Sequence, residues 1–288
     1  MKSLRETIKE AEGKGVAVGH FNISNLEGLH AIYDAARKLN VPVIIGVSEG
    51  EENFVGLEEV TSLIRTIRER DDYPIFLNAD HHASFDSVQK CIDAGFDSVI
   101  IDVAKSSFEE NVKLTKECVD YARKVSADTG RDILVEGELG YIGSGSNIKD
   151  SIPEGAGILT KVDEAKEFVE LTGIDMLAPS VGSIHGLIKT GKPHINAELV
   201  KEIREATGVP LVLHGGSGLR DEDFTNAIAS GISIVHINTE IRVAFKDGLE
   251  KSLKENPDEV VPYKIMDDVE EAIEQVVENR LKLVNGIK

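Results

Sequence analysis

Six of the eight histidines stand at the ends of short apolar runs, where buried strands would stop. Acidic residues accompany them, such as Asp80 before one pair and Glu138 after another run. Imidazole nitrogens bind divalent ions such as zinc, and three that converge on one point form a metal site. A single histidine at a strand end is more often structural, so the residues alone leave both interpretations open. The six are His20, His81, His82, His185, His214 and His236.

A glycine-rich segment, His214-Gly-Gly-Ser-Gly-Leu, follows an apolar run and precedes a helix predicted to start near Asp221. Backbone N–H groups of such a segment can bind an anion, because glycine lets a ligand approach closely. Ser217 and Lys189 could add a hydroxyl donor and a positive charge. A phosphate site and an ordinary glycine-rich turn are the two interpretations of this motif.

These residues need a scaffold, and the chain offers a regular one. Eight short runs rich in valine and isoleucine predict strands buried on both faces. Amphipathic stretches at 57–70, 85–94, 108–125 and 197–206 predict helices between them. The alternation indicates a (β/α)8 TIM barrel; a doubly wound open sheet is the alternative, but a glycine-rich fingerprint after the first strand is missing. The runs are 15–21, 42–47, 74–77, 98–103, 132–135, 175–181, 210–213 and 232–237.

The barrel prediction also makes a geometric demand on the active site. Active sites of this fold form at the carboxyl ends of the strands, which is where the histidines and carboxylates stand. Adjacent residues of a strand point to opposite faces. Asp80 and His81 can therefore both reach the site only if the backbone turns there.

Composition excludes several classes of protein. With 32 basic and 51 acidic residues, the 288-residue chain has a formal charge of −19, which disfavours nucleic-acid partners. No apolar run approaches the ~20 residues that span a bilayer, and the charged N-terminus lacks a secretory signal. We therefore expect a cytoplasmic protein with no membrane partner, forming one domain over residues 1–288. Cys91 and Cys118 should be reduced core thiols, not a disulfide or a metal pair.

Two segments interrupt the alternation of strands and helices. Residues 140–157 are rich in glycine and serine and too long for an ordinary loop, so they predict a lid. Residues from about 257 to 288 predict a C-terminal helical extension. Its charged helix, 269–284, should pack on the barrel exterior or on a partner subunit.

An ordered series of motifs across roughly residues 15–245 resembles the class II, zinc-dependent ketose-bisphosphate aldolases, and the fructose-bisphosphate enzymes among them. Such an ordered set is far more specific than any single motif. The matching pieces are Phe21-Asn22-Ile23, Val47-Ser48-Glu49-Gly50, Asp80-His81-His82, residues 94–99 leading to Asp102, Phe108-Glu109-Glu110-Asn111, residues 136–140, Ile184-His185-Gly186 with Lys189, and residues 213–218.

The resemblance implies a lyase of carbohydrate metabolism and glycolysis. It would reversibly cleave a ketose bisphosphate, with fructose 1,6-bisphosphate as first candidate, to dihydroxyacetone phosphate and an aldehyde phosphate. One catalytic Zn²⁺ would stabilise the charge that develops on the ketone oxygen, and a monovalent cation could accompany it. The family further implies a homodimer or homotetramer, and no partner beyond the sugar phosphate.

Roles carry over from the resemblance by position. His81, His185 and His214 match the zinc ligands, whereas His82 is expected to be structural. Asp80 matches the acid/base that exchanges a proton with the substrate hydroxyl, and Asp102 matches a carboxylate ending the fourth strand. Glu138 matches a further carboxylate near the metal. The residues that match positions binding the substrate and its phosphate are Asn22, Ser48, Gly186, Lys189, Gly215 and Ser217.

The chain departs from the family pattern around the site. The eighth strand ends His236-Ile237-Asn238-Thr239, so a histidine replaces the asparagine that contacts substrate, while Thr239 still suits a phosphate. Arg242 matches a position that can hold a second phosphate, or is an exposed helix arginine. The fourth-strand loop reads Asp102-Val-Ala-Lys in place of Asp-Gly-Ser-His.

The predicted lid differs as well, because it lacks the acidic residue that usually follows Gly140. Its only acidic residues are Asp150 and Glu154, and one of them is predicted to move the carbon-bound proton of dihydroxyacetone phosphate. Glu138 is the rival for this role. These departures leave open a tagatose-bisphosphate or deoxy-ketose-phosphate aldolase, a sugar-phosphate-binding barrel without turnover, and, less well supported, a metal-dependent hydrolase.

Overall fold

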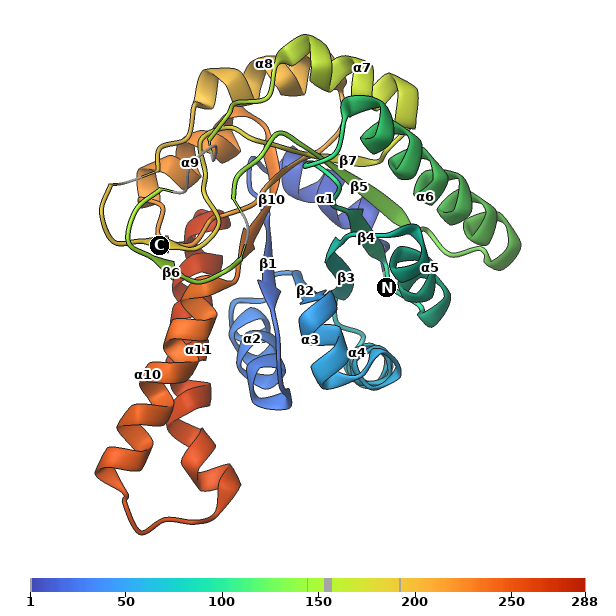
Figure 1. The fold of residues 1–288 in the computed structure, drawn as a ribbon. Coiled ribbons are helices and arrows are strands. Elements are labelled where there is room, and N and C mark those ends of the chain that lie inside the picture. Colours follow the sequence, from blue (N-terminus) through green and yellow to red (C-terminus); the bar gives the residue numbers. More distant parts are fainter. Residues whose placement is uncertain (1, 144, 153–156, 192, 288) are drawn as a thin grey trace.

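Figure 1 shows the chain as a computed structural model, which describes residues 2–143, 145–152, 157–191 and 193–287. Eight parallel strands close into a barrel, each paired with the next along the chain and the last with the first. The TIM-barrel prediction is confirmed, and the open-sheet alternative is excluded. Around the barrel the strands are β1 (Val18–Asn22), β2 (Val43–Ser48), β3 (Ile75–His82), β4 (Ser98–Ile101), β5 (Leu134–Leu139), β7 (Met176–Pro179), β9 (Leu211–Leu213) and β10 (Ile232–Ile237).

Two strands are longer than the apolar runs that predict them. β3 ends at His82 and not at residue 77, and β5 ends at Leu139 and not at residue 135. The polar residues of these extensions are mostly buried: most of them face the barrel interior and its mouth, whereas His82 packs on the outer face of the strand. An apolar pattern cannot reveal such strand ends, since their side chains face a polar site.

Helices cover the outside of the barrel. Polar caps start several of them: Asn25 accepts the N–H of Gly28 at 3.0 Å, and Ser107 accepts that of Glu110 at 3.2 Å. The helices are α1 (Leu4–Gly13), α2 (Leu26–Leu39), α3 (Glu49–Val55), α4 (Leu57–Asp71), α5 (Phe85–Ala94), α6 (Phe108–Thr129), α7 (Val162–Thr172), α8 (Ala197–Thr207), α9 (Asp221–Ser230), α10 (Thr239–Glu255) and α11 (Pro262–Val284).

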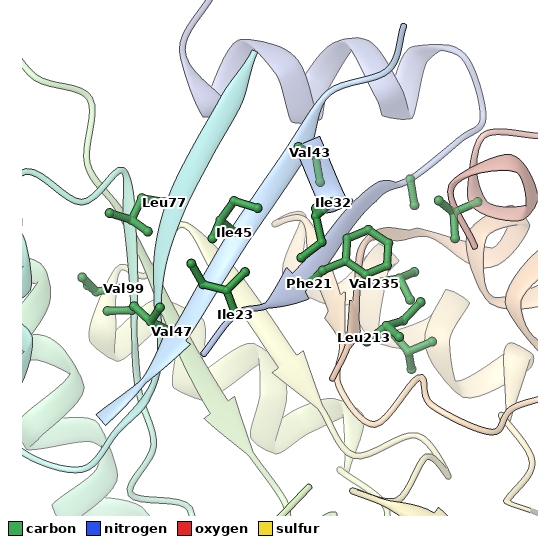
Figure 2. Packing of buried hydrophobic residues seen from close by; sticks show 14 of the residues in the cluster. Phe21, Ile23, Ile32, Val43, Ile45, Val47, Leu77, Val99, Leu213 and Val235 are labelled. Carbon is green, nitrogen blue, oxygen red and sulfur yellow. The ribbon is translucent and has the colours of Figure 1, made fainter. Parts of the chain in front are cut away.

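Strand alternation sorts the apolar side chains into two layers. Val43, Ile45 and Val47 of β2 point outward into the core between strands and helices, which Figure 2 shows in close-up. Ile44 points inward and joins the interior of the barrel. There Leu4 and Ile8 of α1 close the floor against residues such as Phe76 and Met176, leaving only the mouth for a site.

The C-terminal extension is a helical hairpin. α10 and α11 pack against each other and project well beyond the barrel, and α11 also packs on α2 (Figure 1). α11 begins at Pro262 instead of the predicted residue 269, because only its later part carries the buried apolar stripe. Among the described residues, no helix has both the length and the hydropathy needed to cross a bilayer.

The predicted lid contains structure that its composition does not signal. Within its described part, β6 (Ile148–Lys149) pairs in parallel with β8 (Leu187–Ile188), and Tyr141 forms a bridge with Ile158. The segment is thereby joined to the loop after β7, which carries His185.

Candidate active site

Three histidines from different strands converge at the barrel mouth. His81 lies in β3, His185 follows β7 and His214 follows β9. One ring nitrogen of each lies within 4.8 Å of the others. His81 Nε2 and His214 Nδ1 are 2.9 Å apart, and the rings of His81 and His185 have centroids 4.8 Å apart. The structure thus brings together the three predicted metal ligands.

Each of the three imidazoles also has an acceptor for its second nitrogen. Such contacts select the tautomer and leave the opposite nitrogen free to ligate a metal. Two acceptors are carboxylates at neighbouring strand ends, and the third is a backbone carbonyl of the lid segment. The pairs are His81 Nδ1 with Asp102 Oδ2 at 2.8 Å, His214 Nε2 with Glu136 Oε1 at 2.7 Å, and His185 Nδ1 with the Gly143 carbonyl at 2.9 Å.

The backbone turn demanded by the sequence is present. His81 has a φ of 53°, and the pairing of β3 with β4 shifts register between Ala79 and His82. The left-handed conformation costs a residue other than glycine roughly 1–3 kcal/mol. It lets Asp80 and His81 face the same mouth, with 3.8 Å between Asp80 Oδ1 and His81 Nε2, while His82 turns to the other face.

Asp80 is buried and held in a fixed orientation. Its Oδ2 accepts a hydrogen bond of 2.8 Å from Asn22 Nδ2, and its Oδ1 lies 3.3 Å from His236 Nδ1. Burial opposes its ionisation, but His81 and His236 outweigh burial and hold the pKa of Asp80 well below its usual range. Asp80 is therefore a carboxylate at neutral pH, the form in which it can accept a proton.

His236, which replaces the family's asparagine, belongs to a stack of imidazoles. Its ring lies parallel to that of His20, with centroids 3.5 Å apart, and 4.0 Å from that of His214. His20 is fully buried and contacts Asn78 Oδ1 at 3.1 Å. The sequence indicates no role for His20 beyond its place at a strand end, and the structure shows that it stacks on His236.

The electrostatic potential of the site favours a bound cation. Burial would lower the pKa of His81, yet Asp80, Asp102 and Glu138 raise it to about 10. Burial raises the pKa of Glu138 to about 8, with help from the charge of Asp102. Glu138 Oε2 lies 3.6 Å from His81 Nδ1 and has no hydrogen-bond partner among the described residues. The surroundings thus stabilise one positive charge at the point where the imidazoles meet, so the residues fit a divalent ion.

A second carboxylate organises the opposite side of the mouth. Glu51 of α3 is buried and accepts hydrogen bonds from Ser48 and from Asn22, the latter at 2.8 Å. Its other oxygen accepts Arg242 Nη2 at 2.7 Å. Arg242 therefore points into the site, next to Ser48 and Asn238 in a cavity of about 300 Å³. No sequence signal indicates Glu51, which lies between the predicted strand 42–47 and the predicted helix 57–70, in a helix that the sequence analysis does not predict.

The proposed phosphate residues gather beside this cavity. Gly215 and Gly186 have φ values of 66° and 98°, and a Cβ on either would collide with backbone atoms at 2.8 and 2.3 Å. Both glycines are thus required for packing of the loops, whatever ligand binds. Ser217 and Thr239 are buried, and Thr239 begins α10.

Lys189 and Asp150 lie elsewhere, outside this cluster of residues. Lys189 Nζ forms an ion pair of 2.9 Å with Asp150, and the two side chains are 63% and 89% exposed. Asp150 does not lie over the metal ligands in this structure; its proton-transfer role requires closure of the lid and stays a prediction. Glu154, the other candidate, lies outside the described residues.

Comparison with known proteins assigns the chain to a family. The family model for class II fructose-bisphosphate aldolases matches residues 2–287. The chain belongs to this family. The fructose-bisphosphate aldolase of Geobacillus stearothermophilus is 38% identical over 97% of this chain and 95% of its own. The probable fructose-bisphosphate aldolase of Bacillus subtilis is also 38% identical, over 97% and 96%.

Solved structures give the same result. The crystal structure of the YdjI aldolase from Escherichia coli K12 matches with a TM-score of 0.82 and 33% identity, over 98% of this chain and 96% of its own. Family membership makes the chain a metal-dependent aldolase, a lyase that acts on a sugar phosphate, and decides against the hydrolase alternative.

Proposed function

We propose that this aldolase reversibly cleaves fructose 1,6-bisphosphate to dihydroxyacetone phosphate and an aldehyde phosphate. The observation that carries the proposal is the convergence of three imidazoles beside the ionised, fixed carboxylate of Asp80. His81, His185 and His214 would hold the ion, and three nitrogen ligands favour zinc. When bound, the ion supplies Lewis acidity for the negative charge that develops on the ketone oxygen.

Asp80 is the group proposed to move the hydroxyl proton. In cleavage, it takes the proton from the hydroxyl of the carbon that leaves as the aldehyde, while the adjacent C–C bond breaks. Asn22 and His236 hold its carboxylate at 2.8 and 3.3 Å, so the carboxylate needs no reorientation before the transfer. Asp80 returns the proton in the condensation direction.

Glu138 is the group proposed to move the carbon-bound proton. The electron pair of the broken bond must receive a proton at carbon, and an acid with a pKa near neutrality can both give and recover it. Glu138 is buried beside His81, and its pKa of about 8 meets this requirement. Asp150 is the weaker candidate because it is exposed and paired with Lys189.

The phosphate of the dihydroxyacetone half is proposed to bind where the loop after β9 meets the start of α10. Gly215 and Ser217 belong to the loop after β9, and Ser217 Oγ accepts the N–H of Glu240 in the first turn of α10, whose N-terminal end at Thr239 favours an anion. Gly186, in the loop after β7, would approach the phosphate from its other side. Lys189 would contact this phosphate only if its ammonium group left Asp150 and paired with the phosphate instead. His236 and Asn238 would contact the sugar carbons, and Arg242 would bind the second phosphate while keeping Glu51 as its partner.

We also propose one domain that assembles as a homodimer or homotetramer. The hairpin of α10 and α11 exposes apolar side chains at its tip, with Val260 81% and Tyr263 71% exposed. Such a projecting apolar surface is suited to contact a second copy. Light scattering on the full chain measures the mass, and a monomer at micromolar concentration would contradict the assembly.

The function is tested by comparing two substrates that differ only at C4. Fructose 1,6-bisphosphate and tagatose 1,6-bisphosphate are assayed in parallel for release of triose phosphate, with the metal content of the same sample measured. We expect a higher kcat/KM for the fructose compound. A preference for tagatose bisphosphate would change the substrate but not the reaction. Failure to cleave either compound by metal-loaded protein would favour a binding barrel without turnover.

A further inference from the structure

Three side chains of different metal-binding chemistry meet outside the catalytic mouth, between β3 and the helices α3 and α5. His82 ends β3, Glu52 lies in α3 and Cys91 lies in α5. One ligand atom from each lies within 4.8 Å of the others. The cluster exists because the turn at His81 sends two adjacent histidines to opposite faces of the strand.

The separations within this cluster are those of ligands around a tetrahedral ion. Bond lengths of ~2.0–2.3 Å at tetrahedral angles place neighbouring ligand atoms roughly 3.3–3.8 Å apart. Glu52 Oε2 lies 3.2 Å from Cys91 Sγ and 3.5 Å from His82 Nε2. Both ring nitrogens of His82 lie 3.8 Å from Cys91 Sγ. The two sulfur contacts lie in the longer range of hydrogen bonds to sulfur, and the imidazole also contacts the Val47 backbone.

A path to solvent lies on the Nδ1 side of the His82 ring, whereas Glu52 approaches Nε2. Glu49, in the first turn of α3, has Oε1 3.9 Å from His82 Nδ1. Its side chain is 43% exposed, whereas that of Glu52 is 16% exposed and Cys91 and His82 are fully buried. An ion could therefore enter past Glu49 and reach the sulfur without unfolding the barrel.

We propose that Cys91, His82 and Glu52, with water as the fourth ligand, form a second metal site for zinc or a similar borderline-soft divalent ion. Sulfur and imidazole ligands exclude magnesium and calcium, which prefer oxygen alone. The sequence predicted a structural His82 and an inert core thiol. The spatial cluster revises both, since the ligands come from three elements and no linear motif joins them.

Binding would follow ordinary thiol chemistry. Burial, together with the charges of Glu52 and Glu49, raises the pKa of the Cys91 thiol, so the metal-free cysteine carries its proton. The ion forms a bond to sulfur and the thiol proton leaves to solvent, with no change of oxidation state. The bound ion would join α3 to β3 and α5. It would thereby stabilise the helix that presents Glu51 to the catalytic mouth, without touching substrate.

Cobalt(II) distinguishes this site from the catalytic one. The full chain is produced in medium supplemented with cobalt in place of zinc, and cobalt per chain and the near-ultraviolet spectrum are measured. The catalytic ligands contain no sulfur, so a thiolate-to-cobalt charge-transfer band reports a cysteine ligand. We expect two cobalt ions per chain and this band. One ion per chain with no such band would overturn the proposal.

Variants assign the band to a residue. Cys91→Ala should lose the band and one cobalt ion per chain, whereas Cys118→Ala, which removes the other buried cysteine, should keep both. Glu52→Gln leaves the thiol in place and should weaken the second ion about tenfold or more. If Cys91→Ala does not fold, the Glu52→Gln protein and the wild-type spectrum still decide. A band unchanged by both Cys91→Ala and Glu52→Gln would also overturn the proposal.

Discussion

Buried carboxylates at the two ends of the barrel differ in how completely they are hydrogen-bonded. At the floor, Asp175 is buried and fully engaged: it accepts the N–H of Val135 at 2.9 Å and pairs with Arg5 and Arg123 at 2.9 and 2.8 Å. At the mouth, Asp80 Oδ1 and Glu138 Oε2 are buried without a hydrogen-bond partner among the described residues. Both ends come from the same strands, so the difference lies in what the side chains meet.

The comparison shows which end of the barrel lowers the free energy of unfolding. An unpartnered buried polar atom costs about 1–3 kcal/mol, and the mouth accumulates several of them. They become useful only when a cation and a substrate supply the missing partners. The floor, which α1 closes with apolar side chains, pairs Asp175 completely, although Nη1 of the nearby Arg204 is buried without a partner among the described residues. Substitutions at the mouth should therefore change activity, and those at the floor should change stability.

The largest expected effect is at Asp80. Asp80→Asn keeps the size and shape of the side chain, but the amide cannot accept the hydroxyl proton. The value of kcat should therefore fall by a factor of ~10²–10⁴. Metal content should stay near the wild-type value because the three imidazoles remain, and the melting temperature should stay at the wild-type value or rise because a buried carboxylate oxygen without a hydrogen-bond partner is removed. Steady-state kinetics and metal analysis check this. A variant within a few-fold of wild type would remove Asp80 from the mechanism.

Glu136 should act through His214. Its carboxylate accepts from His214 Nε2 at 2.7 Å, and loss of such an acceptor usually weakens a metal site ~10–100-fold. Glu136→Gln should therefore lower zinc affinity by that factor, measured by competition with a chelator. Glu117→Gln, on the exposed face of α6, is the matched control and should change nothing. An unaltered affinity in Glu136→Gln would make Glu136 merely structural.

Asp175 tests the floor. Asp175→Asn removes two ion pairs and weakens a buried hydrogen bond, so the free energy of unfolding should fall by about 2 kcal/mol. The value of kcat should not change, because the site lies at the other end of the strands. Urea unfolding and kinetics on the same sample measure both. A tenfold loss of kcat in well-folded protein would break the division between mouth and floor.

The smallest effects are expected from the surface pair of Lys189 and Asp150. If Lys189 turns to the phosphate when substrate binds, Lys189→Ala should weaken dihydroxyacetone phosphate binding about 5-fold, near the worth of an exposed pair. Asp150→Ala should slightly strengthen the binding, because it frees the lysine. Calorimetric titration measures both. Slower exchange of the substrate C–H proton in Asp150→Ala would instead revive its role as the acid/base.

The fold could be predicted from local patterns, whereas the three metal ligands were selected among six strand-end histidines only by the family resemblance. Buried parallel strands show as apolar runs, and the histidines stand directly at their ends. Glu136 lies two residues before Glu138 on one strand, so shared orientation could have suggested its role. Glu51 and the cluster around Cys91 left no such trace, because their partners are distant in sequence and meet only through packing. The lid pairing of β6 with β8 was missed since each strand has two residues.

The central claim is that cleavage depends on an ion held by the three convergent histidines. The direct test removes metal with a chelator, measures residual metal and cleavage of fructose 1,6-bisphosphate on one sample, and then adds zinc or cobalt. Activity should fall in proportion to the metal lost and return when it is added, while a protein with His185→Ala should not recover. Full turnover by metal-free protein would contradict the account.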